Sequence, residues 1–288
     1  MLTEPTMHRR RVHRVPALAL ALVALATLGL TACGGDDDDT FTIGIANERP
    51  YGYEEDGEAT GEAPELGREI LSRMDIEVAD FEVVEFGALI GGLNAGRYDM
   101  IAAGMFINDE RAEQVNFADP DYCATTGFAV PEGNPDGLTD FESVIDSGVT
   151  LGVLSGAVEA DYATDSGVPV DQIDVYQSPE DLFDALSAGR VDAATPPPTP
   201  VREQVGGLDG FEATEGFLPV IDGEEQLGCG AFAFPQDQGD VRDEFNDILT
   251  EMKANDEILP IIEEFGFTAA EVDAAKGVTV EDLAGNGG

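Results

Sequence analysis

The sequence predicts an α/β protein built from two lobes, each a sheet flanked by helices. Strand-like and helix-like segments alternate along the chain, which is typical of parallel sheets covered by helices. The alternation starts a second time after residue 125, so two units of similar size follow one another. Of the 288 residues, 43% are hydrophobic, which is enough for a core in each unit.

The first unit has a β-α-β-α-β order. Residues 40–45 have the short, apolar, β-branched character of a strand. Large apolar side chains then recur at helical spacing over residues 64–74, which indicates one buried helix face. We expect strands at 40–45, 81–86 and 100–103, and helices at 64–74 and around 89–93, the second helix ending near Gly96.

The second unit repeats this alternation. Ser178 followed by Pro179 is typical of a helix start, because serine caps the free N–H groups and proline suits the first helical position. We expect strands at 126–130, 149–154, 173–176, 191–194 and 228–234, and helices at 157–164, from 178, at 241–252 and at 257–265, followed by a loose tail.

The charge of the chain excludes two classes of partner. There are 59 acidic and 14 basic residues, for a formal net charge of −45. Nucleic-acid binders and proteins held to anionic lipid by a basic patch both need clustered Lys and Arg, so neither class is expected. An acidic surface with so few lysines is also typical of adaptation to salt, where high net charge maintains solubility.

The N-terminus predicts export and a lipid anchor. Four arginines precede an apolar run over residues 16–30, which is too short to span a bilayer and is typical of a secretory signal. Residues 30–33, Leu-Thr-Ala-Cys, resemble the bacterial lipobox, in which the cysteine becomes the lipidated first residue. We therefore expect a lipoprotein signal peptide over 1–32, lipidation of Cys33 on the outer face of the cell membrane, and an acidic tether over 33–39.

Processing at this site would remove both histidines of the chain, His8 and His13. The remaining protein would then have no Ser–His or Cys–His nucleophile pair and no His-ligated zinc site. We expect no catalytic residue, no metal and no cofactor.

Residues 104–111, Gly-Met-Phe-Ile-Asn-Asp-Glu-Arg, resemble a motif of the family 3 extracellular solute-binding proteins, the substrate receptors of ABC importers. Four further segments resemble the family in the right order: 60–65, 93–99, 117–122 and 151–156. The resemblance covers residues 40–267. It implies a two-lobe type II periplasmic-binding-protein fold with two hinge strands, which closes on its ligand and docks on a membrane permease.

Within this family the chain most resembles the ectoine and hydroxyectoine binders. The residues that carry the likeness are 47–53 (Asn-Glu-Arg-Pro-Tyr-Gly-Tyr), 85–87 with Leu89 and Ile90, and 103–106. Carried over residue by residue, the resemblance implies a ligand site made by Glu48, Tyr51, Phe86, Phe106 and Arg111. Asn108, at the Thr/Asn position of the Arg111 turn, joins this set.

This residue set suits a ring that bears an amidinium cation and a carboxylate. Aromatic faces attract the cation, with about 0.5–2 kcal/mol for each ring. A carboxylate such as Glu48 accepts the N–H groups, and Arg111 offers a planar, bidentate donor to the ligand carboxylate. Each residue alone also has an ordinary structural interpretation. Phe86 or Phe106 could belong to the core, Tyr51 could cover a loop, and Arg111 could form an ion pair at the surface.

The second unit contributes less to the expected site. Residues 155–159 should form a strand-to-helix turn whose N–H groups favour a carboxylate, and Glu159 and Thr195 are expected ligand contacts. Two features depart from the family. Ala157 stands where Thr is usual, and the prolines at 196–198 replace an Asp that commonly binds an α-amino group.

We expect lobe 1 over 40–123 and 234–270, lobe 2 over 124–233, and a flexible tail over 271–288. The hinge strands would be 123–128 and 229–233, each carrying one cysteine. In an antiparallel pair, Cys123 near the first lobe and Cys229 near the second would lie roughly 13 Å apart, beyond disulfide reach, unless the register is staggered. The sequence leaves two alternatives open for these cysteines: they form a disulfide, or each is a small buried hydrophobic residue.

The sequence thus favours a lipid-anchored, monomeric ABC-importer receptor for a small zwitterionic solute, ectoine or hydroxyectoine. A receptor for a polar amino acid of the glutamine type is the alternative in the same family. An exported dehydratase of cyclic acids, with Glu48 or Glu159 as general acid or base, is an alternative from another class.

Overall fold

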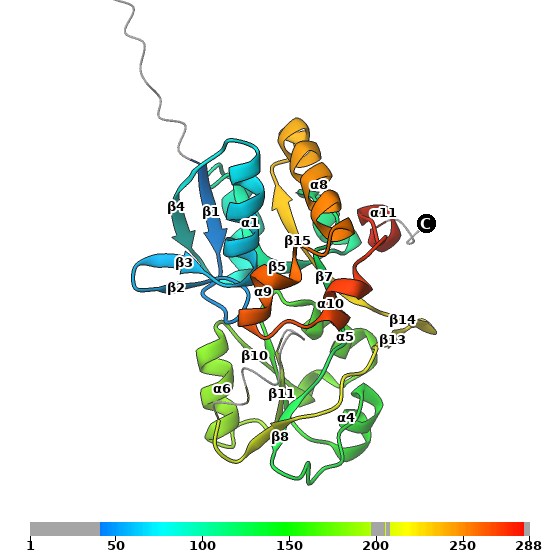
Figure 1. The fold of residues 1–288 in the computed structure, drawn as a ribbon. Helices are drawn as coiled ribbons and strands as arrows, with labels where there is room; N and C mark the ends of the chain where they lie inside the picture. The colour runs from blue at the N-terminus through cyan, green and yellow to red at the C-terminus, as the bar shows by residue number, and fades with distance from the viewer. Residues whose placement is uncertain (1–40, 197–204, 206–207, 285–288) are drawn as a thin grey trace, which may run out of the picture. The chain divides into compact units, whose positions relative to one another are not determined.

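The computed structural model describes residues 41–196, 205 and 208–284, and Asp39–Gly288 forms one compact unit (Figure 1). The expected signal peptide (1–32), Cys33 and the acidic tether (33–39) lie outside the described residues. Among the helices of the described part, none is long and apolar enough to cross a membrane.

Two sheets organise this unit. The first has the strand order β4-β1-β5-β15-β6, with β7 also paired to β15. The strands β1 and β4 are parallel, as are β1 and β5, whereas β15 runs antiparallel to β5, β6 and β7. The bounds are β1 Phe41–Ile45, β4 Val78–Val83, β5 Met100–Phe106, β6 Asn116–Phe117, β7 Tyr122–Ala124 and β15 Gly228–Phe234.

Both faces of the first sheet are covered, because its side chains alternate between two clusters. Along β5, Met100 and Ala102 pack into one cluster, while Ile101 and Ala103 pack into the other. The helices α1 and α8 lie side by side (Figure 1) and cover the first cluster. The helix α2 contributes to the second cluster. These helices are α1 Glu62–Arg73, α2 Leu89–Asn94 and α8 Gly239–Ala254. Burial on both faces explains why β5 and β15 are almost wholly apolar.

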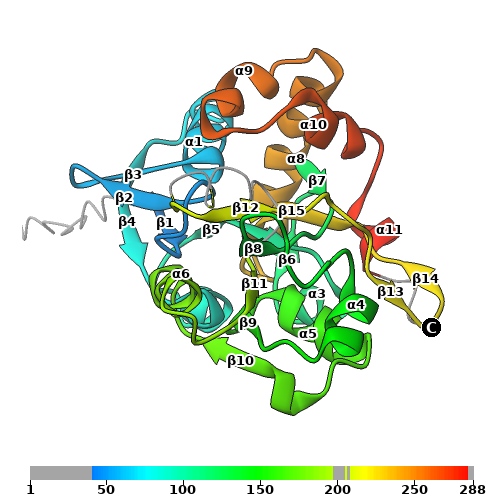
Figure 2. The same ribbon diagram turned by 90° about the horizontal axis from the view of Figure 1, so that it is seen from below.

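The second sheet has the order β10-β9-β11-β8-β12. Alternation again separates two clusters: α6 packs on one face, and α4 and α5 on the other (Figure 2). The bounds are β8 Ala129–Pro131, β9 Leu151–Leu154, β10 Ile173–Tyr176, β11 Ala193–Thr195, β12 Phe211–Ala213, α4 Phe141–Ser147, α5 Val158–Asp165 and α6 Pro179–Ser187. The predicted cap of α6 is confirmed, because the Ser178 hydroxyl accepts the Asp181 N–H.

Shorter elements complete the fold. They are β2 Tyr53–Glu55, β3 Glu58–Thr60, β13 Val220–Ile221, β14 Glu224–Glu225, α3 Asp109–Ala112, α9 Leu259–Ile262, α10 Ala269–Ala274, α11 Val280–Leu283, and the 3-10 helices η1 Phe86–Ala88, η2 Val170–Gln172 and η3 Glu263–Phe265. The strand pairs β2-β3 and β13-β14 form small antiparallel hairpins.

Two strand predictions in the first unit need correction. The strand expected at 81–86 is β4, which ends at Val83 because its parallel register with β1 ends at the pair Ile45↔Val83. Phe86 therefore lies in η1. The strand expected to end at residue 103 continues to Phe106, because antiparallel pairing with β15 holds it as far as Gly230↔Phe106.

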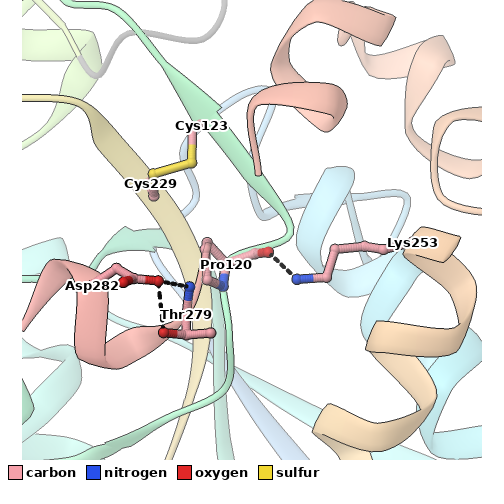
Figure 3. The surroundings of a disulfide bond; sticks show 6 residues. All are labelled: Pro120, Cys123, Cys229, Lys253, Thr279 and Asp282. Atoms are coloured by element: carbon pink, nitrogen blue, oxygen red, sulfur yellow. Dashed lines mark hydrogen bonds between the residues drawn. A yellow bond between two sulfur atoms is a disulfide. The ribbon is translucent and has the colours of Figure 1, made fainter. Parts of the chain in front are cut away.

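The hinge arrangement expected from the sequence also differs. All of β15 pairs with strands of the first sheet, including residues 228–233 that the sequence analysis assigns to lobe 2. Cys229 lies directly opposite Cys123 on β7, with no offset along the strands, and the two form a disulfide (Figure 3). The open question about these cysteines is thereby answered in favour of the disulfide.

The predicted flexible tail is wrong over residues 271–284. A C-terminal strap, residues 268–283, forms α10 and α11 instead. Ala275 is fully buried against Cys123 and Cys229. The backbone N–H of Val280 donates to the Asp119 carboxylate at 3.0 Å, and Thr279 caps α11 through hydrogen bonds with Asp282 (Figure 3). The strap therefore covers the disulfide and is tied to the segment just before β7.

Candidate functional site

Six of the eight predicted ligand residues line one small cavity, with a free volume of about 10 Å³. Its lining is Glu48, Tyr51, Phe86, Ala103, Gly104, Phe106, Arg111, Ala157, Val158 and Glu159. These residues come from the loop after β1, from η1, from the end of β5, from α3 and from the start of α5. Most of them follow the carboxyl end of a strand, where open α/β sheets place their ligands.

A larger groove of about 550 Å³ lies on the other side of the loop after β1, between that loop, α6 and η3. Asn47, Arg49, Pro50 and Tyr53 line this groove, whereas Glu48 and Tyr51 line the smaller cavity. The described lining of the groove includes none of the eight predicted residues, so the smaller cavity is the candidate site.

The loop after β1 positions the first acid and the first aromatic ring. Backbone hydrogen bonds join Glu48 and Gly52 in both directions, at 2.9 and 3.0 Å, and close a tight turn. Within this turn both Glu48 and Tyr51 are buried. The Tyr51 ring stacks on Tyr122, with centroids 6.0 Å apart, and the Tyr122 hydroxyl donates to the Gly104 carbonyl at 3.1 Å. Tyr122 thus supports the Tyr51 ring without lining the cavity. This role of Tyr122 was not predicted from the sequence.

Two glycines make room for the aromatic walls. Gly104 has a φ of 61°, and a Cβ there would come within 2.3 Å of the Tyr51 ring. A Cβ on Gly228 would lie 1.9 Å from the Phe106 ring. Sequence reasoning included Gly104 in a motif without this role and missed Gly228. A glycine inside a strand was the available signal, since it often marks a close approach by another group.

Replacing Gly228 with alanine is expected to destabilise the protein by about 1–3 kcal/mol, because the added methyl group must displace the Phe106 ring. Gly239→Ala is the matched control, since its added Cβ would lie 3.8 Å from the nearest neighbour, the Asn116 side chain. Chemical unfolding of both variants measures the difference. Equal stabilities for the two variants would contradict the packing described here.

Arg111 is held in place by three hydrogen bonds. It lies on α3, where its own N–H donates to the Asn108 side chain, the helix N-cap, at 2.9 Å. Its Nη1 donates to the Phe106 carbonyl at 2.6 Å and its Nη2 to the Gly156 carbonyl at 2.7 Å. The guanidinium also lies 5.5 Å from the centre of the Phe86 ring. Burial lowers the pKa of Arg111, and the Glu159 carboxylate opposes that shift.

The two carboxyl groups of the cavity are buried without sufficient partners. Among the described residues, neither oxygen of Glu48 has a hydrogen-bond partner, and neither does Oε1 of Glu159. Burial raises the pKa of Glu48 to about 8, with further repulsion from Glu159. Burial likewise raises the pKa of Glu159 to about 7, against the attraction of Arg111. Without a ligand cation, the cavity thus favours protonated carboxyl groups.

Two predicted contacts are not brought to the cavity. Asn108 serves as the N-cap of α3. Thr195, on β11, is fully buried and its hydroxyl donates to the Gly127 carbonyl at 3.1 Å. Pro197 and Pro198, where the sequence departs from the family, lie outside the described residues.

We expect the unliganded protein to lose unfolding free energy as the pH rises through about 8. A carboxyl whose pKa is raised on folding stabilises the fold fully below its unfolded pKa, about 4.3, and loses that contribution as the pH rises through the folded value. Glu62 and Asp121, also buried with raised pKa values, act in the same direction.

Glu48→Gln isolates one of these groups. The variant should gain stability relative to the parent with rising pH, by on the order of a few kcal/mol between pH 5 and 9. Urea unfolding across that range gives the difference curve. Parallel curves for the two proteins would show that Glu48 keeps an ordinary pKa.

The site offers acceptors, aromatic faces and one fixed cation. A ligand that carries N–H groups on a cation and a carboxylate would meet each of these features. Within the described ranges, no three His, Cys, Asp or Glu side chains gather as a metal site.

Comparisons with known proteins agree on one class. The model of the bacterial extracellular solute-binding proteins, family 3, matches residues 41–268. The probable amino-acid ABC transporter periplasmic-binding protein y4tE of Sinorhizobium fredii is 33% identical over 250 residues, which cover 85% of this chain and 83% of that protein. The histidine-binding periplasmic protein of Escherichia coli is 25% identical over 215 residues, 69% of this chain and 76% of its relative.

A solved structure, EhuB in complex with hydroxyectoine, is 31% identical with a TM-score of 0.76. The match covers 86% of this chain and 95% of that chain.

Proposed function

The chain belongs to family 3 of the bacterial extracellular solute-binding proteins, and we propose that the solute it binds is ectoine or 5-hydroxyectoine. It is a solute-binding receptor of an ABC transporter, with a small-molecule ligand and a membrane permease as partner. The type II periplasmic-binding-protein fold expected from the sequence is confirmed by the family match and the likeness to EhuB.

One observation carries the class of ligand, a small solute that bears both a cation and a carboxylate. The Glu48 carboxyl is buried without a partner among the described residues, in a cavity with three aromatic walls, and the Arg111 guanidinium lines the same cavity. Ectoine carries an amidinium cation and a carboxylate on one small ring. Its cation would lie against Tyr51, Phe86 and Phe106 and donate to Glu48, and its carboxylate would accept from Arg111.

The geometry of Arg111 supports binding by closure. Its Nη2 donates to the Gly156 carbonyl, which lies in the turn that follows β9, a strand of the second sheet. Arg111 itself lies on α3, which follows β5, a strand of the first sheet. A ligand carboxylate on this guanidinium would contact groups from both sheets and favour the closed form by its differential affinity.

A polar amino acid of the glutamine type is the second candidate. The y4tE protein carries an amino-acid name, as does the histidine-binding relative. An amino acid would place its α-carboxylate on Arg111 and its ammonium on Glu48. The motif at residues 47–53 and the likeness to hydroxyectoine-bound EhuB favour ectoine. We propose a receptor rather than an enzyme, and a turnover assay with cyclic acids would detect a dehydratase.

Location and assembly follow from the same proposal. The family is exported. We propose that Cys33 carries the lipid that holds the receptor at the outer face of the cell membrane, and that the receptor acts as a monomer. Mass spectrometry of the purified membrane form would detect the lipidated cysteine.

Calorimetric titration tests the ligand. A protein that starts at Gly34 keeps every described residue, and high-salt buffer suits its acidic surface. Ectoine, hydroxyectoine, glutamine and arginine are injected in turn. We expect a Kd of about 1 μM or tighter for ectoine or hydroxyectoine, which is about −8 kcal/mol. A clear amino-acid signal without ectoine heat would overturn the ligand and leave the receptor.

A further inference from the structure

The charges of the cavity do not balance. Glu48 and Glu159 both line it, each at most 2% exposed, and Arg111 is the one cation among the described lining residues. If both carboxyl groups are ionised, the lining carries a formal excess of one negative charge. A buried charge without a partner is strongly unfavourable, so protons must compensate it when no ligand is bound. A zwitterionic ligand adds a cation and a carboxylate, so it can replace one of these protons while the other stays on the pair of acids.

Arg111 does not satisfy the two acids. Its Nη1 and Nη2 each donate to a backbone carbonyl, those of Phe106 and Gly156. Both oxygens of Glu48 and Oε1 of Glu159 also have no donor in the described part of the chain. The two acids also come from different elements: Glu48 from the loop after β1, and Glu159 from the first turn of α5.

We propose that Glu48 and Glu159 together form a two-sided acceptor for a cation spread over several N–H groups, and that Glu159 determines selectivity for such a cation over a neutral ligand of the same shape. This inference rests on the proposed function, because it describes the same cavity. Glu48 and Arg111 alone would already bind the cation and the carboxylate of a ligand. The proposal therefore gives the second acid, Glu159, a separate role.

Ligand binding then exchanges a proton for a cation. Before the ligand binds, the raised pKa of Glu48, about 8, keeps a proton on it at neutral pH, whereas Glu159, with a pKa of about 7, is partly protonated there. The groups that face them are Arg111, Asp161 and Tyr162 around Glu159, and Tyr122 near Glu48. When the ligand cation arrives, one of the two carboxyl groups ionises and its proton passes to the buffer. A neutral ligand causes no such release.

The test compares cationic ligands with neutral counterparts of similar shape. Ectoine is paired with pyroglutamate, a neutral cyclic amide with a carboxylate, and arginine is paired with citrulline. The variant Glu159→Gln removes the acid. Asp165→Asn is the matched control, because it removes the same charge from the same helix at an exposed residue that does not line the cavity.

We expect the parent to favour the cationic member of the pair it binds by about a hundredfold or more. Glu159→Gln should reduce this preference at least about tenfold, while Asp165→Asn should leave it within about threefold. Titration at pH 7 in two buffers of different ionisation enthalpy counts the protons. The parent should release protons on binding, and Glu159→Gln should release fewer.

Each outcome decides one claim. Ectoine binding with an unchanged preference and unchanged proton release in Glu159→Gln would overturn this inference and leave the proposed function standing. Preference for arginine over citrulline, lost in Glu159→Gln, would support the inference while refuting ectoine as the ligand. A parent that binds neither cation would overturn both. If Glu159→Gln does not fold, Glu48→Gln and Glu159→Asp replace it. The preference for the cationic ligand should be lost in Glu48→Gln and retained in Glu159→Asp.

Discussion

Replacing Arg111 with alanine is expected to lower solute affinity on the order of a thousandfold. Truncating one partner of a buried, hydrogen-bonded charge pair costs about 2–5 kcal/mol, and a thousandfold corresponds to about 4 kcal/mol. The guanidinium is the one cation among the described residues that line the cavity. Its loss would remove the donors for the ligand carboxylate and also the contact between Arg111 and Gly156. Titration calorimetry with the best ligand measures the effect.

Arg111→Lys separates charge from geometry. Lysine keeps the positive charge but lacks the planar fork that meets two oxygens, so we still expect a loss of about a hundredfold. Arg97→Ala is the control, since Arg97 is an exposed residue paired with Glu82. This variant should bind the solute as tightly as the parent does. Binding by Arg111→Ala within about threefold of the parent would remove this residue from the site.

Removal of the disulfide is expected to cost about 2–5 kcal/mol of unfolding free energy. The bond joins Cys123 and Cys229 across 106 residues of sequence, so it restricts a large loop of the unfolded chain. The double variant Cys123→Ala/Cys229→Ala, unfolded in urea beside the oxidised parent, measures the cost. Ligand affinity should stay the same, because neither cysteine lines the cavity.

The C-terminal strap adds a condition to this experiment. Ala275 is buried against both cysteines, and Val278 and Leu283 pack on the same cluster. A reductant should therefore reduce the folded protein slowly and the urea-unfolded protein quickly. The reduced parent should then unfold like the double variant. A difference below about 1 kcal/mol between oxidised and reduced protein would contradict a stabilising role.

The local structure of this protein follows from short stretches of its sequence. Apolar residues at a spacing of two or of three to four predicted most strands and helices, and β10 and β15 have the predicted bounds. Ser178 predicted its helix start, because a cap depends only on the next few residues. The turns that carry Glu48, Tyr51 and Arg111 could be identified for the same reason: each is a contiguous motif.

The tertiary structure alone decided how distant segments meet. The register of β7 against β15 places Cys123 opposite Cys229, and no local pattern contains that alignment. The same holds for Gly228 beneath Phe106, for Asn108 and Thr195 turned to other partners, and for the strap that replaces the expected tail. Periodicity reports which face of an element is buried. It does not report which distant residues bury it, since that depends on packing across the whole chain.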